Sequence, residues 1–215
     1  MNPWKRRGMP TRGPEDPGLW GFLRVVCLIF LFNVYRYSAR GGETLSAGGV
    51  VLAVSHKSWW DPIFAAMAFN RPLRYMAKAE LFEHRGSRWL VTTLGAYPVR
   101  RGESDVQSLR RSLEILAEGG VLGMFPEGHR FHDDVIHPFH AGISLLAARS
   151  GCPVVPVAIR GTKVMARHKL PRFPRVRVAV GAPVDVSDIE GRGGERHAAA
   201  AERVRLAVEQ LYESL

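Results

Sequence analysis

The sequence has few cysteines, few acidic residues and no long apolar run, and each shortage argues against a class of protein or of structure. The two cysteines, Cys27 and Cys152, are too few for a disulfide framework, and both lie in or beside apolar segments where a thiol packs like a small hydrophobic side chain. The longest uninterrupted apolar run, residues 25–32, has eight residues, whereas a spanning helix needs about 20. No small-residue cleavage site follows it cleanly, as a secretory signal peptide would require. The sequence therefore indicates neither an oxidising compartment nor a simple transmembrane helix.

The shortage of acidic residues leaves a formal net charge of +10, with 30 lysines and arginines against 20 acidic residues. Residues 1–40 hold seven basic and two acidic side chains, so half of the excess lies in this segment. Basic charge suits nucleic acid, anionic lipid or anionic substrates. Here it flanks the most apolar stretch of the chain, which favours a membrane surface over nucleic acid. We expect a protein bound peripherally, or inserted shallowly, at the cytoplasmic face of the cell membrane.

The chain divides into three parts. Residues 1–18 are rich in proline, glycine and charge and are typical of a flexible basic tail. Within residues 19–40, the segment 19–38 predicts an apolar helix lying in the membrane interface, with Trp20, Tyr35 and Tyr37 at headgroup depth. The alternative is a helix packed entirely on its own domain. Residues 45–215 form the remaining domain.

This domain alternates predicted strands and helices. Short β-branched or apolar runs predict strands at residues 50–55, 73–76, 96–99, 121–125, 154–159 and 175–180. Helical patterns fall at 63–69, from a capping box at Ser104 to the glycines at 119 and 120, at 141–150 and at 201–215. The alternation predicts a single α/β domain with a largely parallel or mixed sheet flanked by helices.

The most informative segment joins the first of these strands to a helix. The apolar run 50–55 ends at His56, and Asp61-Pro62 then predicts a helix start with Asp61 as the cap and Pro62 in the first helical position. His56 would leave the carboxyl end of a strand, where α/β folds place their chemistry, and Asp61 would fold back onto its imidazole. A histidine oriented by a carboxylate is suited to taking a proton from a hydroxyl.

Spacing alone does not establish this pair. His129 and Asp134 repeat the interval, although no strand precedes them and no helix start follows. The ordinary alternative for His56 and Asp61 is a surface histidine beside a structural helix cap. Evidence from other segments of the sequence is needed to choose between these two interpretations.

Three further segments carry such information. Residues 95–102 place Arg100 and Arg101 at the end of a strand. Residues 125–130, Phe-Pro-Glu-Gly-His-Arg, pack an acid, a glycine and an arginine into one turn after a buried strand. Residues 154–159 are an apolar strand whose internal proline, Pro156, predicts a sheet edge or a bulge.

In this order and spacing the four segments resemble the glycerolipid acyltransferases, specifically the 1-acyl-sn-glycerol-3-phosphate (lysophosphatidic acid) acyltransferases, over about residues 45–165. The resemblance implies an O-acyltransferase that moves a fatty acyl group from acyl-CoA or acyl-carrier protein to the sn-2 hydroxyl of the lysolipid, without a metal or organic cofactor. It assigns catalysis to His56 and Asp61. It assigns binding of the glycerol phosphate to the following residues: Arg101, Glu127, Gly128 and Arg130.

The sequence also departs from the pattern of this family. Ser55 stands where asparagine is common, His129 where threonine or serine is usual, and Pro98 where an aromatic or aliphatic residue is usual. These departures leave the acid–base pair intact and leave another lysolipid or glycolipid acceptor open. A noncatalytic basic protein that binds lipid or nucleic acid is the alternative from another class.

Four histidines and two aspartates gather in residues 129–140, which raises the question of a metal site. Their intervals do not match a zinc pattern, and no cysteine lies near them. We therefore interpret this stretch as a polar loop without a metal.

Overall fold

The computed structural model describes residues 17–42, 45–99, 106–164 and 173–215. Its core is a seven-stranded sheet in the order β1-β7-β6-β2-β5-β3-β4. The five strands from β6 to β4 run parallel, while β7 pairs antiparallel with β6 and parallel with β1. The strands are β1 Ser38–Arg40, β2 Val50–Val54, β3 Leu73–Lys78, β4 Ala96–Val99, β5 Val121–Met124, β6 Val154–Arg160 and β7 Arg177–Val180.

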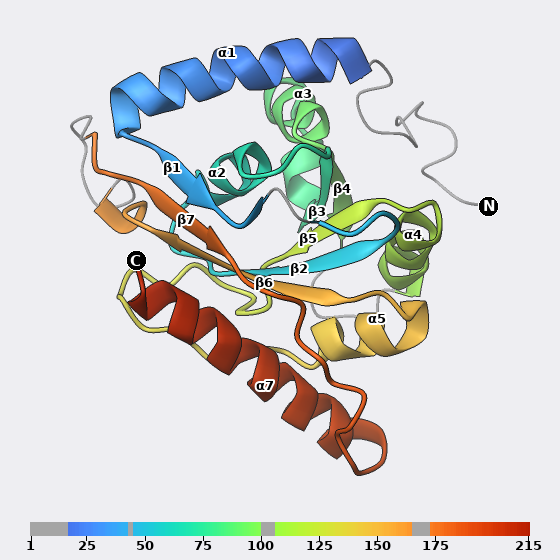
Figure 1. Cartoon of the computed structure of the whole chain (residues 1–215). Coiled ribbons are helices and arrows are strands. Elements are labelled where there is room, and N and C mark those ends of the chain that lie inside the picture. Colours follow the sequence, from blue (N-terminus) through green and yellow to red (C-terminus); the bar gives the residue numbers. More distant parts are fainter. Residues whose placement is uncertain (1–16, 43–44, 100–105, 165–172) are drawn as a thin grey trace.

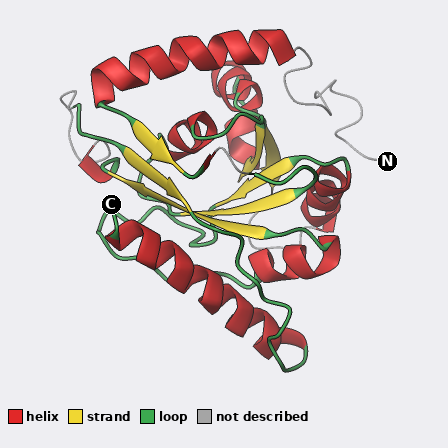
Figure 2. Cartoon of the chain, viewed as in Figure 1, coloured by secondary structure: helices red, strands yellow, loops and turns green. Residues whose placement is uncertain are grey.

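Helices cover both faces of this sheet (Figure 1). The elements are α1 Pro17–Tyr35, α2 Asp61–Met67, the 3₁₀ turn η3 Ala79–Phe82, α3 Arg85–Thr93, α4 Val106–Ala117, α5 Gly142–Ser150 and α7 Gly193–Glu213. Figure 2 shows α1, α2 and α3 on one side of the strands, and α4, α5 and α7 on the other. The expected single α/β domain with a mixed sheet between helices is confirmed.

The central strand β2 explains why both faces need cover. All five of its residues are buried. Val50, Leu52 and Val54 pack into the core beneath α1 and α2, whereas Val51 and Ala53 pack into the core beneath α5 and α7. A strand with no polar face belongs in the middle of a parallel sheet, and this one ends at Val54, two residues before His56.

Helix α1 has one buried side and one solvent-exposed side. Leu31 is buried, and Cys27 and Leu28 pack against the core. The opposite side exposes Val25, Val26, Ile29, Phe30 and Phe32. The helix therefore packs on its own domain and still presents an apolar outer surface. Among the described helices, none is long and apolar enough to cross a membrane.

The end of α1 differs from the prediction. The helix stops at Tyr35 because Arg36 adopts a left-handed conformation, with φ of 46°. Ser38 then donates its N–H to the carbonyl of Val176 and begins β1, a strand that we did not predict. Tyr37 is buried and donates its hydroxyl hydrogen to the carbonyl of Phe64, so its predicted position at headgroup depth is wrong.

Of the two positions predicted for Pro156, a sheet edge or a bulge, the edge is wrong. Strand β6 lies between β2 and β7, inside the sheet. Its ladder with β7 starts at Val157, and beyond that pair Gly181 donates its N–H to the carbonyl of Pro156. The proline therefore sits where the antiparallel ladder ends, and its missing N–H costs no strand pairing there.

The other predicted strands lie within two residues of those observed, and residues 96–99 match β4. Helix α3 and the turn η3 were not predicted. Ser104, Arg100, Arg101 and most of the proposed basic tail lie outside the described residues. The division of the chain into tail, apolar helix and domain stays a prediction.

Candidate active site

The candidate site lies at the carboxyl ends of two neighbouring parallel strands. Strands β2 and β5 pair along four residues, from Val50 with Val121 to Ala53 with Met124. His56 follows the first strand and Glu127 the second, so two segments distant in sequence leave the same edge of the sheet side by side. This edge is where open α/β sheets bind their ligands.

His56 and Asp61 are in contact. Nδ1 of His56 lies 3.1 Å from Oδ2 of Asp61, which is fully buried. The same oxygen accepts the backbone N–H groups of Lys57 and Ser58, each at 2.6 Å. Trp60, not Asp61, is the residue before helix α2, so the predicted cap is displaced by one position. The carboxylate instead folds back over the loop, as the sequence suggested.

The imidazole of His56 is held on its face as well as at Nδ1. Its ring stacks on Phe125, with ring centroids 4.1 Å apart, and its side chain is 12% exposed. Within the part of the chain that the structure describes, Nε2 has no hydrogen-bond partner. With Nδ1 protonated and facing the carboxylate, Nε2 is the nitrogen able to accept a proton from a ligand.

Glu127 is buried, and its partners are protein groups. Oε1 accepts the backbone N–H of His56 at 2.8 Å. Oε2 lies 3.1 Å from Nζ of Lys57 and 3.2 Å from the backbone nitrogen of His137. The carboxylate thus ties the loop after β2 to two points of the segment between β5 and α5, and this geometry favours positioning of His56 over direct contact with a substrate.

Gly128 has a conformational reason to be glycine. Its φ is +72°, and a Cβ built there would lie 2.6 Å from Nε2 of His140. Most side chains avoid this backbone region, and the neighbouring imidazole removes the remaining space. The turn after β5 thus depends on this glycine whether or not a substrate approaches it.

Arg130 lies beside the histidine loop. Its guanidinium carbon is 3.5 Å from the ring centroid of Trp59. The next residue, Phe131, donates its N–H to the carbonyl of His56 at 3.2 Å. The structure therefore brings together five of the six predicted site residues; Arg101, the sixth, lies outside the described residues.

Comparison with known proteins shows the family of this chain. The model of the Acyltransferase family matches residues 36–160, more than half of the chain. The chain belongs to this acyltransferase family. The match spans β2, the His56 loop, β5 and the Glu127 turn, and it ends with β6.

Individual acyltransferases show the same relationship. The chain is 30% identical over 165 residues to the 1-acyl-sn-glycerol-3-phosphate acyltransferase of Streptococcus pneumoniae, covering 76% of this chain and 60% of that protein. It is 35% identical over 107 residues to the lyso-ornithine lipid O-acyltransferase of Pseudomonas aeruginosa, covering 49% of this chain and 40% of that one. The chain thus spans about 60% or less of the length of these two relatives.

A solved acyltransferase shares the fold. The crystal structure of the 1-acyl-sn-glycerophosphate acyltransferase PlsC from Thermotoga maritima superposes with a TM-score of 0.64. The sequences are 22% identical, and the match covers 94% of this chain and 84% of the other. The fold expected from the sequence resemblance is confirmed.

Lys57 is the site residue that sequence reasoning missed. Its side chain is 1% exposed, and its ammonium contacts Glu127, the carbonyl of Val135 at 2.5 Å and Oδ1 of Asp133 at 3.7 Å. Lysine is rarely buried, and nothing in the local sequence marks this one. The only available signal was its position next to His56.

The second His-x-x-x-x-Asp interval has a different environment. The carboxylate of Asp134 bonds Lys163 and accepts a hydrogen bond from the Tyr212 hydroxyl. The His129 ring instead contacts Phe131, edge to face. The described residues form no group of three or more potential metal ligands, although His137 and Asp133 are paired at 2.8 Å. Asp134 therefore supports the loop and does not orient His129.

Two ionisable groups near the site have shifted pKa values. Burial raises the pKa of Tyr75 well above its usual value, so this phenol stays neutral and donates to the carbonyl of Pro62 at 2.8 Å. Burial opposes ionisation of Asp133, but hydrogen bonds from His137 and Val135, together with the charge of Lys57, lower its pKa overall. The loop beside His56 therefore carries a carboxylate at neutral pH.

Proposed function

We propose that this protein transfers a fatty acyl group from an acyl thioester to the sn-2 hydroxyl of a 1-acyl-sn-glycerol-3-phosphate, forming phosphatidic acid. The observation that carries this proposal is the 3.1 Å contact between Nδ1 of His56 and Asp61, which leaves Nε2 without a hydrogen-bond partner among the described residues. Family membership and the similarity to an acyltransferase named for this reaction support the same conclusion.

The chemistry requires a base because a free alcohol is a poor nucleophile at neutral pH. Nε2 of His56 takes the hydroxyl proton as the oxygen attacks the thioester carbonyl and a carbon–oxygen bond forms. The tetrahedral intermediate then expels the thiolate, breaking the carbon–sulfur bond, and the imidazolium returns the proton to sulfur. Asp61 fixes the tautomer of His56 and stabilises its charged form. No acyl-enzyme forms, and no metal or organic cofactor takes part.

The remaining predicted residues have supporting roles in this proposal. Arg130 and Arg101 bind the phosphate of the acceptor, since guanidinium stays charged and donates in a bidentate geometry. Gly128 shapes the turn that carries Arg130, and Glu127 holds the backbone of His56. The acyl donor is acyl-CoA or acyl-carrier protein.

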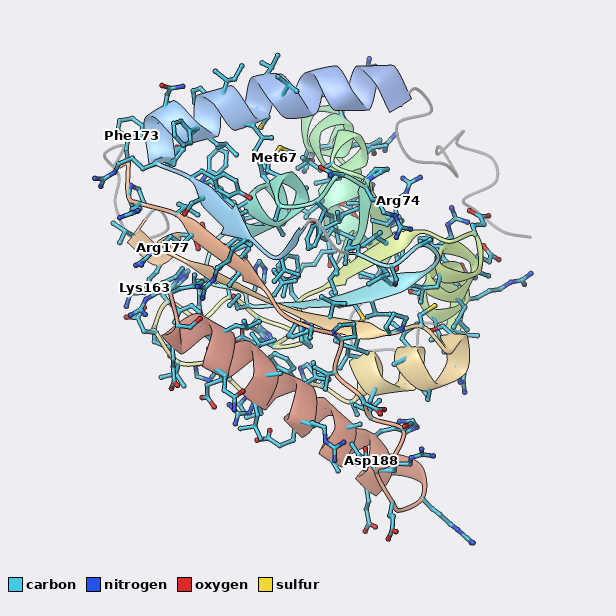
Figure 3. The ribbon with its side chains drawn as sticks, in the orientation of Figure 1. Met67, Arg74, Lys163, Phe173, Arg177 and Asp188 are labelled. Carbon is cyan, nitrogen blue, oxygen red and sulfur yellow. The ribbon has the colours of Figure 1, made fainter. Side chains whose placement is uncertain are left out.

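The solvent-exposed apolar side of α1 supports the proposal that the protein binds its lipid substrate at a membrane surface. The Tyr35 ring at the end of α1 packs against Phe64 of α2, with centroids 5.6 Å apart, and α2 begins at Asp61. Figure 3 shows Phe173 at this same end of α1, and its ring contacts Tyr35. Helix α1, whose other side exposes apolar residues, thus packs on the helix that begins with Asp61. We propose peripheral binding at the cytoplasmic face of the cell membrane.

A lyso-ornithine lipid is the second candidate acceptor, favoured by the 35% identity to an acyltransferase named for it. Purified protein would be offered lysophosphatidate or lyso-ornithine lipid with acyl-CoA or acyl-carrier protein, and the products identified by mass spectrometry. We expect phosphatidate as the main product. Acylation of lyso-ornithine lipid alone would favour the second candidate. Free fatty acid alone would indicate a hydrolase, and no turnover would indicate a noncatalytic lipid-binding protein.

A further inference from the structure

An exposed tryptophan covers one face of an arginine at the candidate site. The guanidinium carbon of Arg130 lies 3.5 Å from the centre of the Trp59 ring, a distance that places it directly over the indole. Trp59 is 60% exposed, whereas Arg130 is half-buried. The two residues belong to the loops after β2 and β5, so the contact joins the loop that carries His56 to the loop that carries Arg130.

Backbone hydrogen bonds fix the position of both partners. Oδ2 of Asp61 accepts the N–H groups of Lys57 and Ser58, which closes the turn that carries Trp59. On the other loop, the N–H of Phe131 bonds the carbonyl of His56. The stacked pair is therefore tied to the residues that hold the imidazole, and its orientation relative to His56 does not depend on side-chain packing alone.

Stacking constrains a guanidinium in a particular way. The group is planar, and its N–H donors point outward in its own plane. An indole on its face fixes that plane while the donors keep their in-plane directions. In a 1-acyl-sn-glycerol-3-phosphate, the carbon with the reacting hydroxyl is bonded to the carbon with the phosphate ester. A side chain that binds the phosphate must therefore lie close to the base and keep a fixed position relative to it.

We propose that Trp59 is a positioning residue that fixes the guanidinium plane of Arg130 for the phosphate monoester of the acceptor, and so favours acceptors with this headgroup. The inference rests on the proposed function, because it assumes that Arg130 meets the phosphate. Trp60 provides a matched control in the same turn. Its side chain is 46% exposed, and its ring has no aromatic or cation–π contact with Arg130 among the described residues.

The test measures binding without a membrane, so that an insertion of Trp59 into lipid cannot affect the result. Calorimetry gives the dissociation constant of soluble 1-hexanoyl-sn-glycerol-3-phosphate for wild type, W59A, W59F, W60A, R130A and the W59A/R130A pair. We expect W59A to weaken binding about two- to tenfold, the size of a partly exposed cation–π contact. W59F should retain most of the affinity and W60A all of it. In the R130A background, W59A should have no further effect.

Three results would overturn the inference: wild-type affinity in W59A, equal losses in W59A and W60A, or the same loss from W59A with and without Arg130. Steady-state acylation of the same compound is followed in parallel, where we expect W59A to raise KM and leave kcat unchanged. If the wild-type protein binds the compound, and W59A and R130A weaken that binding as expected, but the compound is never acylated, the proposed function is contradicted. The inference about Trp59 and Arg130 would still hold.

Discussion

The ammonium of Lys57 lies 3.1 Å from Oε2 of Glu127, 70 residues later in the chain, and both side chains are buried. This pair joins the loop after β2 to the turn after β5. Because Oε1 of Glu127 also accepts the N–H of His56, the pair holds the backbone of the proposed base.

Removing one partner should therefore destabilise the protein strongly. Breaking a buried ion pair leaves an uncompensated charge and costs about 3–5 kcal/mol. We expect Lys57→Met to lower the free energy of unfolding by about this amount, measured by chemical denaturation. The K57M/E127Q double variant removes both charges of this pair and should recover much of the loss. A double variant less stable than K57M would contradict the pairing.

Asp134 predicts a stability change with pH. Its hydrogen bond with Lys163 lowers its pKa below the ordinary value of 3.8, against a smaller opposing effect of burial. A group with a lowered folded-state pKa stabilises above its unfolded pKa and loses that contribution as the pH falls through the folded value. The thermal midpoint of wild type should therefore exceed that of Asp134→Asn at pH 6, and the difference should shrink below about pH 4. A difference independent of pH would contradict this assignment.

The outer side of α1 predicts membrane binding that one charge can weaken. Phe32 is 68% exposed on this side, and a glutamate there would carry a charge into the interface. We expect Phe32→Glu to reduce co-sedimentation with anionic phospholipid vesicles by about tenfold, from the lost burial of one aromatic side chain. Leu206, exposed on α7 across the sheet, supplies the control. Equal losses in F32E and L206E would argue against a specific membrane face.

Much of the architecture could be predicted because its signals are local. The β-branched run before His56 and the proline after Asp61 predict a buried strand, a loop and a helix, and the structure has all three. The residues of α7 that pack on the sheet share one face at helical spacing. The N-cap of α2 is Trp60, one residue before the predicted Asp61, because the Asp61 carboxylate accepts a backbone N–H of the preceding loop, that of Lys57.

The missed features depend on distant partners. Strand β1 is three residues long and exists through its pairing with β7, so its own sequence carries little strand signal. Tyr37 resembles an interfacial aromatic until its hydroxyl meets the carbonyl of Phe64. Lys57 looks like an exposed cation because its carboxylate partner follows another strand. In each case tertiary contacts outweigh what the local residue pattern indicates.

The most direct test of the account compares His56 with the other histidine that precedes an aspartate by five residues. Acyl transfer to lysophosphatidate is measured for wild type, His56→Ala and His129→Ala, with folding checked by circular dichroism. We predict that H56A stays folded and loses about 10²- to 10⁴-fold in rate, the usual contribution of general acid–base catalysis, while H129A stays close to wild type. A folded H56A that transfers acyl groups at the wild-type rate would contradict the central claim.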